Sequence, residues 1–197
     1  MPPLPKFAWT QAPEANRHVT KVIQECNWLQ GLEGGIDTSH APIMHRLLSE
    51  TSKRGGFKPS NPFVRGKAPN LVVDITDYGY QYAGIRSLDG SENVHIRTYQ
   101  FIMPFHQIRP SKSESGLDLD AGHIWVPIDD YNCMVYNWTY TFADQPLSEA
   151  DSEQLGRHIG SAPEELTADF RKVRNKDNDW LIDRQVQKTE TYTGIEG

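Results

Sequence analysis

The stretch LVVDITDYGYQYAGIRSLDGSENVHIRTYQFIMPF, residues 71–105, decides the fold, because it holds three β-branched and aromatic segments separated by turn residues. Two further segments of this kind follow, HIWVPID at 123–129 and CMVYNWTYTF at 133–142. The short separations and the DGSEN turn at 89–93 favour antiparallel pairing. The sequence therefore predicts a five-strand meander, with the polar excursion SKSESGLDLD, 111–120, on its rim.

The segments that flank the meander complete an α+β order. Residues 18–25, HVTKVIQE, alternate and are rich in β-branched side chains, which predicts a strand leading directly into a helix. The stretch 50–70 is rich in Gly, Pro, Ser and basic residues without a period, which predicts a long surface loop. After Ala143 the sequence predicts acidic helices, one capped by Ser148 and another starting at Ser161.

Length and composition predict one globular domain with a sizeable core, since the chain has 197 residues, 37% hydrophobic and 23% charged. The net charge of -6 and the pI near 5.6 leave no basic footprint for nucleic acid or anionic membrane. No run approaches the roughly 18 apolar residues of a membrane span, and no signal-peptide core is present, so we expect a cytoplasmic protein. The two cysteines, Cys26 and Cys133, cannot hold a zinc or iron–sulfur site between them.

The stretch CNWLQGLEGGIDTSHAPIMHR, residues 26–46, carries the residue types of a metal site. Two acids and two histidines have the spacing E-x3-D-x2-H-x4-H, namely Glu33, Asp37, His40 and His45. On a continuous helix the first three lie on one face, whereas His45 lies about 140° from His40. Proline disrupts a helix, so Pro42 predicts a break around 41–43 that lets both imidazoles converge.

The spacing indicates iron chemistry. Two imidazoles and one carboxylate at an iron(II), with the remaining positions open, form the arrangement that binds and activates O2. His40 and His45 supply the imidazoles. Asp37, one turn before His40, is better placed to accept the other ring N–H of that histidine, which would orient the ligand and raise its basicity.

Three glycines lie in the predicted helix, Gly31, Gly34 and Gly35, and each weakens it by up to about 1 kcal/mol relative to alanine. Helix propensity is therefore not optimised in this segment. The cost predicts close approach of another backbone or side chain to the helix.

Two other readings of the histidines remain open at this point. Two histidines five residues apart are, taken alone, more often unrelated surface or core residues, but the neighbouring acids and proline favour a metal site. A zinc hydrolase with Glu33 or Asp37 as base is a third possibility. The spacing argues against it, because zincin sites place both histidines four apart on one unbroken helix face.

The segment ECNWLQGLEGGIDTSHAPIMHR, 25–46, resembles the mononuclear-iron segment of Rieske non-haem iron aromatic-ring oxygenase large (alpha) subunits, especially the phthalate 4,5-dioxygenase-like group. Supporting matches are PPLPKFAW, QFIMPF, HIWVPIDDYN and NDWLIDRQVQKTETYTGIEG, so the likeness covers nearly the whole chain. It corresponds to the C-terminal catalytic domain only. The resemblance implies an α+β helix-grip fold of the Bet v 1/START-like kind, in which a curved antiparallel sheet grips helices.

The resemblance also implies roles for the candidate residues. His40 and His45 look like iron ligands, and Asp37 like the bridge that receives electrons from a Rieske histidine of the neighbouring subunit. Glu33 is either a second residue of that interface or an ordinary helix acid. The third iron ligand of the family is an aspartate, which we expect downstream of TGIEG, 193–197.

These likenesses predict a domain that works as part of a larger subunit. Residues 1–18, with four prolines, are expected to be a linker or lead-in from a Rieske domain, and 19–197 a catalytic mononuclear-iron domain truncated at its C-terminus. The cofactor expected in this chain is mononuclear Fe(II). A [2Fe–2S] cluster is expected only in the parent protein, because the C-x-H and C-x2-H patterns are missing from this sequence.

Substrate-contacting residues are predicted on the sheet above the iron, although core packing is the commoner role for such aromatic side chains. The candidates are Phe101, Met103, Phe105 and His106. Arg46 and Arg97 are candidate planar forks for a substrate carboxylate, with surface charge as the alternative for each.

The leading hypothesis is a Rieske-type ring-hydroxylating oxygenase domain, which hydroxylates or O-demethylates an aromatic acid such as a phthalate-like compound and is inactive as an isolated fragment. Its implied partners are the aromatic substrate, O2, an NAD(P)H-dependent reductase and copies of the same subunit, in a homotrimer or hexamer. The alternative is a non-catalytic module of helix-grip fold that binds a hydrophobic ligand. That alternative predicts little iron and no O2 consumption.

Overall fold

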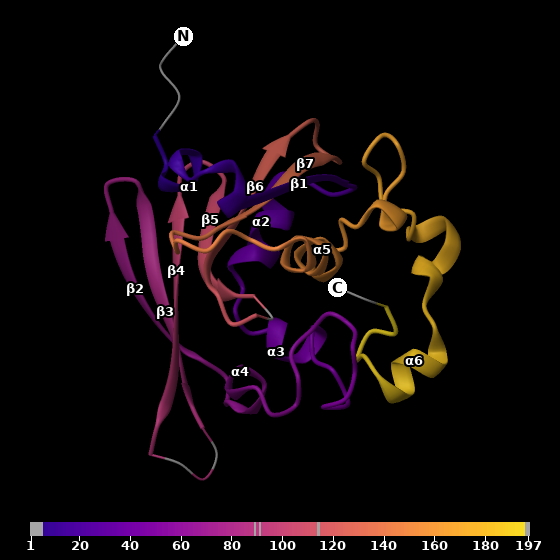
Figure 1. Ribbon diagram of the computed structural model, residues 1–197, viewed down its shortest axis with the longest axis horizontal. Coiled ribbons are helices and arrows are strands. Elements are labelled where there is room, and N and C mark those ends of the chain that lie inside the picture. Colours follow the sequence, from indigo (N-terminus) through magenta and orange to yellow (C-terminus); the bar gives the residue numbers. More distant parts are fainter. Residues whose placement is uncertain (1–5, 89, 91, 114, 196–197) are drawn as a thin grey trace.

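The computed structural model describes residues 6–88, 90, 92–113 and 115–195. Its centre is one seven-stranded antiparallel sheet in the order β1-β7-β6-β5-β4-β3-β2 (Figure 1). The first strand therefore pairs with the last one, although the two are far apart in sequence. The strands are β1 (Arg17–Gln24), β2 (Asn70–Thr76), β3 (Gly79–Ser87), β4 (Val94–Ile102), β5 (His106–Lys112), β6 (Asp118–Pro127) and β7 (Cys133–Tyr140).

Short helices complete the fold, and α2 and α3 lie within the curve of the sheet (Figure 1). The architecture is the predicted α+β one, a curved antiparallel sheet that grips helices. None of the helices in the described ranges combines the length and apolarity that a bilayer crossing requires. The helices are α1 (Ala8–Gln11), η1 (Glu14–Asn16), α2 (Trp28–Ile36), α3 (Ala41–Met44), α4 (Pro62–Arg65), α5 (Glu149–His158), η2 (Pro163–Glu165), η3 (Lys176–Leu181) and α6 (Arg184–Thr189).

The meander from β2 to β7 has six strands, one more than predicted, because HQIRPSK forms β5. This segment is polar and contains Pro110, so its pattern does not indicate a strand. The pairing of β5 with β4 covers only 106–108, whereas its pairing with β6 extends to Lys112. Pro110 thus lies where β5 has no partner on its β4 side, and such positions tolerate proline.

The helices after the sheet agree only in part with those predicted from the sequence. Ser148 caps α5 as predicted, within a capping box whose other member is Asp151. The prediction of a helix from Ser161 onward is wrong, because only the short 3-10 helix η2 forms there. The hydroxyl of Thr167 accepts the backbone N–H of Arg171 at 3.1 Å, so a side chain offers this segment a local alternative to helical bonding.

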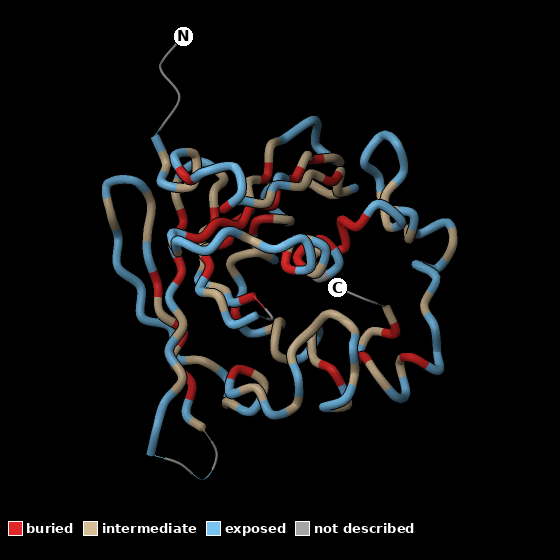
Figure 2. The backbone as a smooth tube through the Cα atoms, viewed as in Figure 1, coloured by how far each residue is buried: buried red, intermediate tan, exposed pale blue. Residues whose placement is uncertain are grey.

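The two faces of the sheet have different coverings, and Figure 2 shows buried segments along its central strands. On the outer face, Trp9 of α1 stacks on Trp138 with ring centroids 5.2 Å apart. The predicted lead-in therefore contains two short helices, α1 and η1, and packs on the sheet through Trp9. Its residues 1–5 lie outside the described ones. On the inner face, α2 packs on a core cluster of Val22, Leu32, Phe101, Trp125, Cys133 and Val135.

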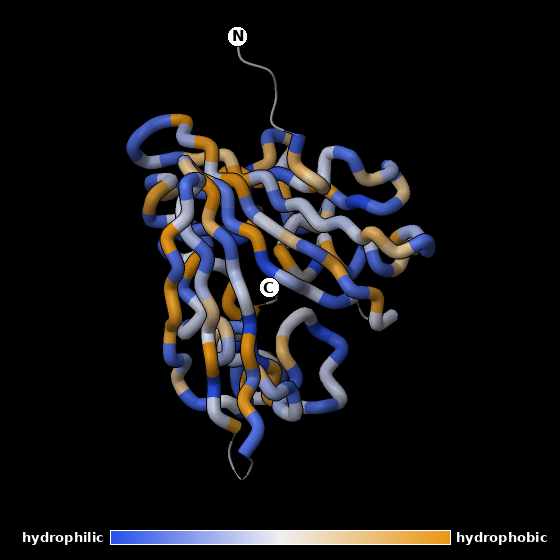
Figure 3. Tube along the Cα trace, turned by 90° about the vertical axis from the view of Figure 1, so that its left-hand side faces the viewer, coloured by the Kyte–Doolittle hydropathy of each residue, from blue (hydrophilic) through white to orange (hydrophobic). Residues whose placement is uncertain are grey.

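The edge strand β2 is exposed on both faces despite its apolar sequence. The exposed fractions of Leu71, Val72 and Ile75 are 55%, 58% and 77%. Figure 3 looks onto this side of the molecule and shows apolar stretches along its long strands. The core therefore lies between α2 and the central strands, and β2 adds little to it.

The Trp125 ring lies so close to α2 that two of the three helix glycines have no room for a side chain. A Cβ atom on Gly35 would lie 2.2 Å from Trp125 Cη2, and one on Gly31 would lie 2.8 Å from Trp125 Cδ1. A Cβ on Gly34 would meet nothing within 4 Å. The predicted close approach is thus confirmed for Gly31 and Gly35, where an indole ring packs directly on the backbone of α2.

Replacing Gly35 by alanine is expected to lower the free energy of unfolding by about 1–3 kcal/mol, because the new methyl group overpacks against Trp125. Gly34→Ala is the matched control one position away. It is expected to leave stability unchanged or raise it by up to about 1 kcal/mol through helix propensity. Urea denaturation of both variants checks this, and equal losses would contradict the packing described.

Candidate metal centre

A turn at Asp37 connects α2 to the candidate ligands. α2 ends at Ile36, and the carboxylate of Asp37 accepts the backbone N–H groups of Ser39 at 2.7 Å and His40 at 3.1 Å. This Asx-type turn competes with helical hydrogen bonding. The expectation that Glu33, Asp37 and His40 share one helix face is therefore wrong, because the helix ends before Asp37.

Pro42 starts a helix instead of breaking one. It lies in the first turn of α3, where a missing N–H costs nothing. The break predicted at 41–43 therefore lies earlier, at 37–40. The two imidazoles nevertheless converge, since the ring centroids of His40 and His45 are 5.4 Å apart at an interplanar angle of 64°.

Side chains from the sheet fix the turn through Thr38. The Arg86 guanidinium is fully buried and donates to the backbone oxygen of Thr38 and, at 3.0 Å, to its hydroxyl. The Tyr99 hydroxyl lies 2.6 Å from the same Thr38 hydroxyl. The Tyr82 hydroxyl donates to the carbonyl of Ile36. Strands β3 and β4 therefore hold both ends of the segment that precedes His40.

Asp37 also bonds directly to the first histidine, with 3.0 Å between Asp37 Oδ2 and His40 Nδ1. Burial raises the pKa of Asp37, but hydrogen bonds from Ser39 and His40 outweigh it and hold the pKa below its ordinary value of 3.8. A depressed carboxyl pKa stabilises the turn at neutral pH, and that contribution is lost as the pH falls through the folded-state pKa. The carboxylate is thus ionised in the neutral range.

The histidine pair fits two positions of a mononuclear iron. Asp37 engages His40 Nδ1, which leaves His40 Nε2 for a metal. An imidazole nitrogen lies about 2.1 Å from a bound ion, so two rings on one ion have centroids roughly 5 Å apart, close to the observed separation. Within the described residues, no third His, Cys, Asp or Glu joins them to form a metal-binding group.

A cavity of about 490 Å³ joins these residues to the inner face of the sheet. Asp37, His40 and His45 line it from the helical side. Polar side chains of β4 to β7 line it from the sheet side: Arg97, Tyr99, Arg109, His123 and Asn137. A chamber with a histidine pair on one side and cationic and amide groups on the other can bind a polar or anionic small molecule.

Most of this polar wall was not predicted from the sequence. Arg109 belongs to the unpredicted strand β5, and His123 has no acid or histidine at chelating spacing in the sequence. His123 Nδ1 lies 2.6 Å from Asn137 Oδ1, which only accepts, so Nδ1 carries the proton. The available signal is the alternation of residues along each strand, which places all five polar residues on the inner face.

The two arginines of the wall bond to neutral oxygen acceptors. Arg97 donates to the carbonyl of Pro110 at 2.9 Å, and Arg109 to the amide oxygen of Gln107 at 3.3 Å. Neither forms an ion pair with a carboxylate in the described part of the chain. Burial, followed by the charge of Arg97, lowers the pKa of Arg109 to about 10, which still leaves it protonated at neutral pH.

The other predicted site residues do not line this cavity. Phe101 is a core residue on the inner face, Met103 is 63% exposed, and His106 packs against Phe105 with ring centroids 5.3 Å apart. Glu33 is exposed on α2, and the Arg46 guanidinium lies 5.1 Å from the centroid of the Tyr192 ring. These roles stay predictions.

The fold and site define a helix-grip domain in which a histidine pair and an acid face an internal cavity. The chain belongs to the family described as LigXa C-terminal domain like, whose model matches residues 1–197. This finding confirms the resemblance drawn from the 25–46 segment.

Three characterised relatives are oxygenase subunits. The chain is 29% identical to the phthalate 4,5-dioxygenase oxygenase subunit of Pseudomonas putida, over 98% of this chain and 45% of that protein. It is 29% identical to the 3-chlorobenzoate-3,4-dioxygenase oxygenase subunit of Comamonas testosteroni, over 100% of this chain and 47% of that protein. It is 26% identical to the 5,5'-dehydrodivanillate O-demethylase oxygenase subunit of a Sphingobium species, over 81% of this chain and 37% of that protein. The chain thus spans less than half the length of these relatives.

Proposed function

We propose that this chain is the catalytic part of an oxygenase subunit that hydroxylates or O-demethylates an aromatic acid with O2 at a mononuclear non-haem iron(II). The observation that carries the proposal is the convergence of His40 and His45, with Asp37 bonded to the first, on a cavity whose other wall holds Arg97 and Arg109. The relatives named for phthalate, chlorobenzoate and dehydrodivanillate support an aromatic substrate.

In this proposal His40 and His45 hold the iron, and an aspartate after residue 197 is the third protein ligand. Iron(II) held by two imidazoles and a carboxylate keeps open positions at which O2 is bound and activated. The hydrogen bond from His40 Nδ1 to Asp37 would orient the ring and leave Nε2 as the nitrogen that holds the metal. The buried Arg86 and the Tyr99 hydroxyl hold the turn in place.

Asp37 has a second proposed role, in electron delivery. Its side chain is 43% exposed while it bonds to a candidate ligand, so it can reach both the site and a partner surface. We propose that it bridges to a histidine of a Rieske [2Fe–2S] domain in a neighbouring subunit of a homotrimer or hexamer. An NAD(P)H-dependent reductase would supply the electrons, and Glu33, exposed on the same segment, is a candidate for that interface.

The substrate carboxylate is proposed to lie against Arg97 and Arg109. These two cations form no ion pair with any described carboxylate, so an anionic ligand would supply charge-assisted hydrogen bonds, which are stronger than neutral ones. His123 and Asn137 add further polar contacts on the same wall. The polar wall favours this substrate class over the alternative of a purely hydrophobic ligand.

The proposed function is tested with a subunit of the length of its relatives, loaded with iron(II) and supplied with reductase, NAD(P)H and a panel of aromatic acids. O2 consumption matched by oxidised product is the expected result. An iron-loaded subunit that binds apolar ligands but consumes no O2 with any acid would favour the non-catalytic binding module.

Arg109→Met is expected to raise KM for an aromatic acid by about 10- to 100-fold, because it removes a charged hydrogen-bond donor worth about 1.5–3 kcal/mol. The change in kcat is expected to be small, since ground state and transition state lose the contact equally. Steady-state kinetics with the acid and with its methyl ester check this. Arg184→Met, at an exposed position at the start of α6, is the matched control, and an equal KM increase for acid and ester would contradict the carboxylate contact.

A further inference from the structure

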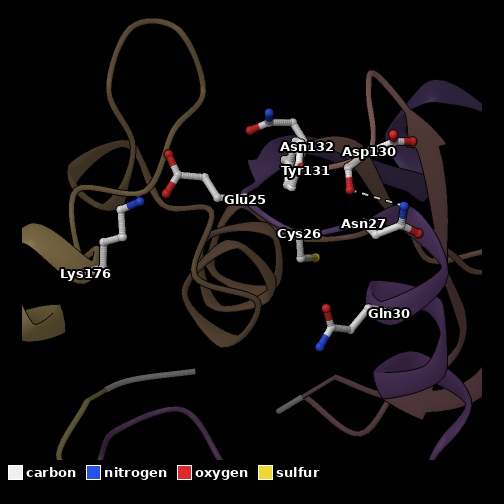
Figure 4. Close-up of a pocket in the computed structure, with 8 residues that line it drawn as sticks. All are labelled: Glu25, Cys26, Asn27, Gln30, Asp130, Tyr131, Asn132 and Lys176. Atoms are coloured by element: carbon white, nitrogen blue, oxygen red, sulfur yellow. Dashed lines mark hydrogen bonds between the residues drawn. The ribbon is translucent and has the colours of Figure 1, made fainter.

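A second pocket, separate from the histidine cavity in all but the shared Gln30, opens beside the start of α2. It has a volume of about 580 Å³. Its lining is polar and charged, with Glu25, Asn27 and Lys176 around the Cys26 side chain (Figure 4). Asn27 donates to the backbone oxygen of Asp130 at 3.2 Å and so ties the start of α2 to the β6–β7 turn. Cys26 is therefore a half-buried thiol at the wall of a water-accessible pocket.

The second cysteine, Cys133, belongs to the core cluster against which Cys26 packs. It is fully buried on the inner face of the sheet. Gln24, the last residue of β1, is the register partner of Cys133, and Cys26 follows it by two residues just beyond the end of the strand. Burial, together with the charge and hydrogen bonding of Cys26, raises the pKa of Cys133 to about 12. The two thiols thus interact, while only one of them borders the pocket.

We propose that Cys26 is a site of reversible oxidation and that Cys133 is its resolving thiol. Hydrogen peroxide that enters the pocket transfers one oxygen atom to the Cys26 sulfur, forming a sulfenic acid and releasing one water. The Cys133 sulfur then attacks the Cys26 sulfur; the S–S bond forms, and the hydroxyl leaves with the Cys133 proton as a second water. Two thiols lose two electrons and two protons, and the peroxide is reduced to two waters.

The chemistry of the pair suits these roles. A buried thiol of high pKa stays protonated and does not react with the oxidant itself. Once Cys26 is a sulfenic acid, the Cys133 sulfur is the thiol packed beside it, so it attacks the Cys26 sulfur and its proton leaves with the hydroxyl. The disulfide would join the residue before the N-cap of α2 to β7, and the opposite end of α2 leads to Asp37.

The test is peroxide treatment of the chain, followed by thiol counting and non-reducing peptide mapping. Because the chain has two cysteines, any intrachain disulfide must be this one. The expected result is loss of both thiols in the monomer, a peptide joining Cys26 to Cys133, and return of both thiols with dithiothreitol. Cys133→Ser is expected to accumulate sulfenic acid at Cys26, detected with dimedone. Cys26→Ser is expected to leave Cys133 unmodified.

Two outcomes would overturn the proposal. One is oxidation of wild-type Cys26 to sulfinic acid while Cys133 remains a thiol. The other is a disulfide between two chains in place of the internal one. If a serine variant fails to fold, thiol counting and peptide mapping of the wild-type chain still test the proposal. Neither result bears on the iron site, since the readout needs neither metal nor substrate.

Discussion

Replacing His45 by alanine is expected to lower product formation by more than about 100-fold, and His40→Ala is expected to do the same. Loss of a residue that only orients a metal ligand typically lowers metal affinity or activity by 10- to 100-fold. We therefore expect a larger loss of activity when a ligand itself is removed. The ring centroids of His40 and His45 lie 5.4 Å apart and both rings line one cavity, so each variant removes one of the two proposed nitrogen ligands. Product formation by the iron-supplied subunit is the measurement.

The matched control for both variants is His18→Ala. His18 is half-buried on β1 and does not line the cavity, and burial lowers its pKa, as expected for a packed neutral imidazole. Its removal is expected to change stability and leave turnover per folded protein within a few-fold of wild type. Comparable activity losses in all three variants would show that the effect follows folding and not metal binding.

Asp37→Asn is expected to lower turnover by about 10- to 100-fold while iron remains bound. The amide keeps the shape of the side chain and an oxygen for the Ser39 N–H, but it loses the charge that favours the bond from His40. It also removes the proposed electron bridge. Iron content and turnover, measured on the same preparation, separate this outcome from simple loss of the metal.

Glu33→Gln is the control for Asp37→Asn, because Glu33 is exposed on the preceding helix and does not line the cavity. An exposed charge pair is worth up to about 1 kcal/mol, so a Glu33 interface contact predicts at most a roughly five-fold change. Full activity of Asp37→Asn with unchanged iron content would rule out the bridging role.

The sheet and the histidine pair were predictable because their signals are local. Period-two alternation identifies five of the six strands from β2 to β7, and the acid and proline around the histidines mark a special segment. Strand β5 was not predictable in this way, because tertiary pairing with β6 keeps a polar segment with Pro110 in the sheet. Tertiary contacts override propensity there.

The end of α2 and the cavity wall required the structure for a different reason. Asp37 continues a plausible helix in sequence, but its carboxylate bonds the following N–H groups, and Arg86 and Tyr99 hold Thr38 from distant strands. The periodicity of the sequence reports local structure and does not predict these long-range contacts. The approach of Arg109 to the histidines likewise depends on sheet register, so a segment-by-segment reading does not identify it.

The proposal that His40 and His45 hold the iron is tested most directly by iron(II) titration of a subunit of the length of its relatives. We expect tight binding of one iron per wild-type subunit and none by His40→Ala, with the fold of the variant verified by circular dichroism. Tight one-to-one binding by His40→Ala would contradict it.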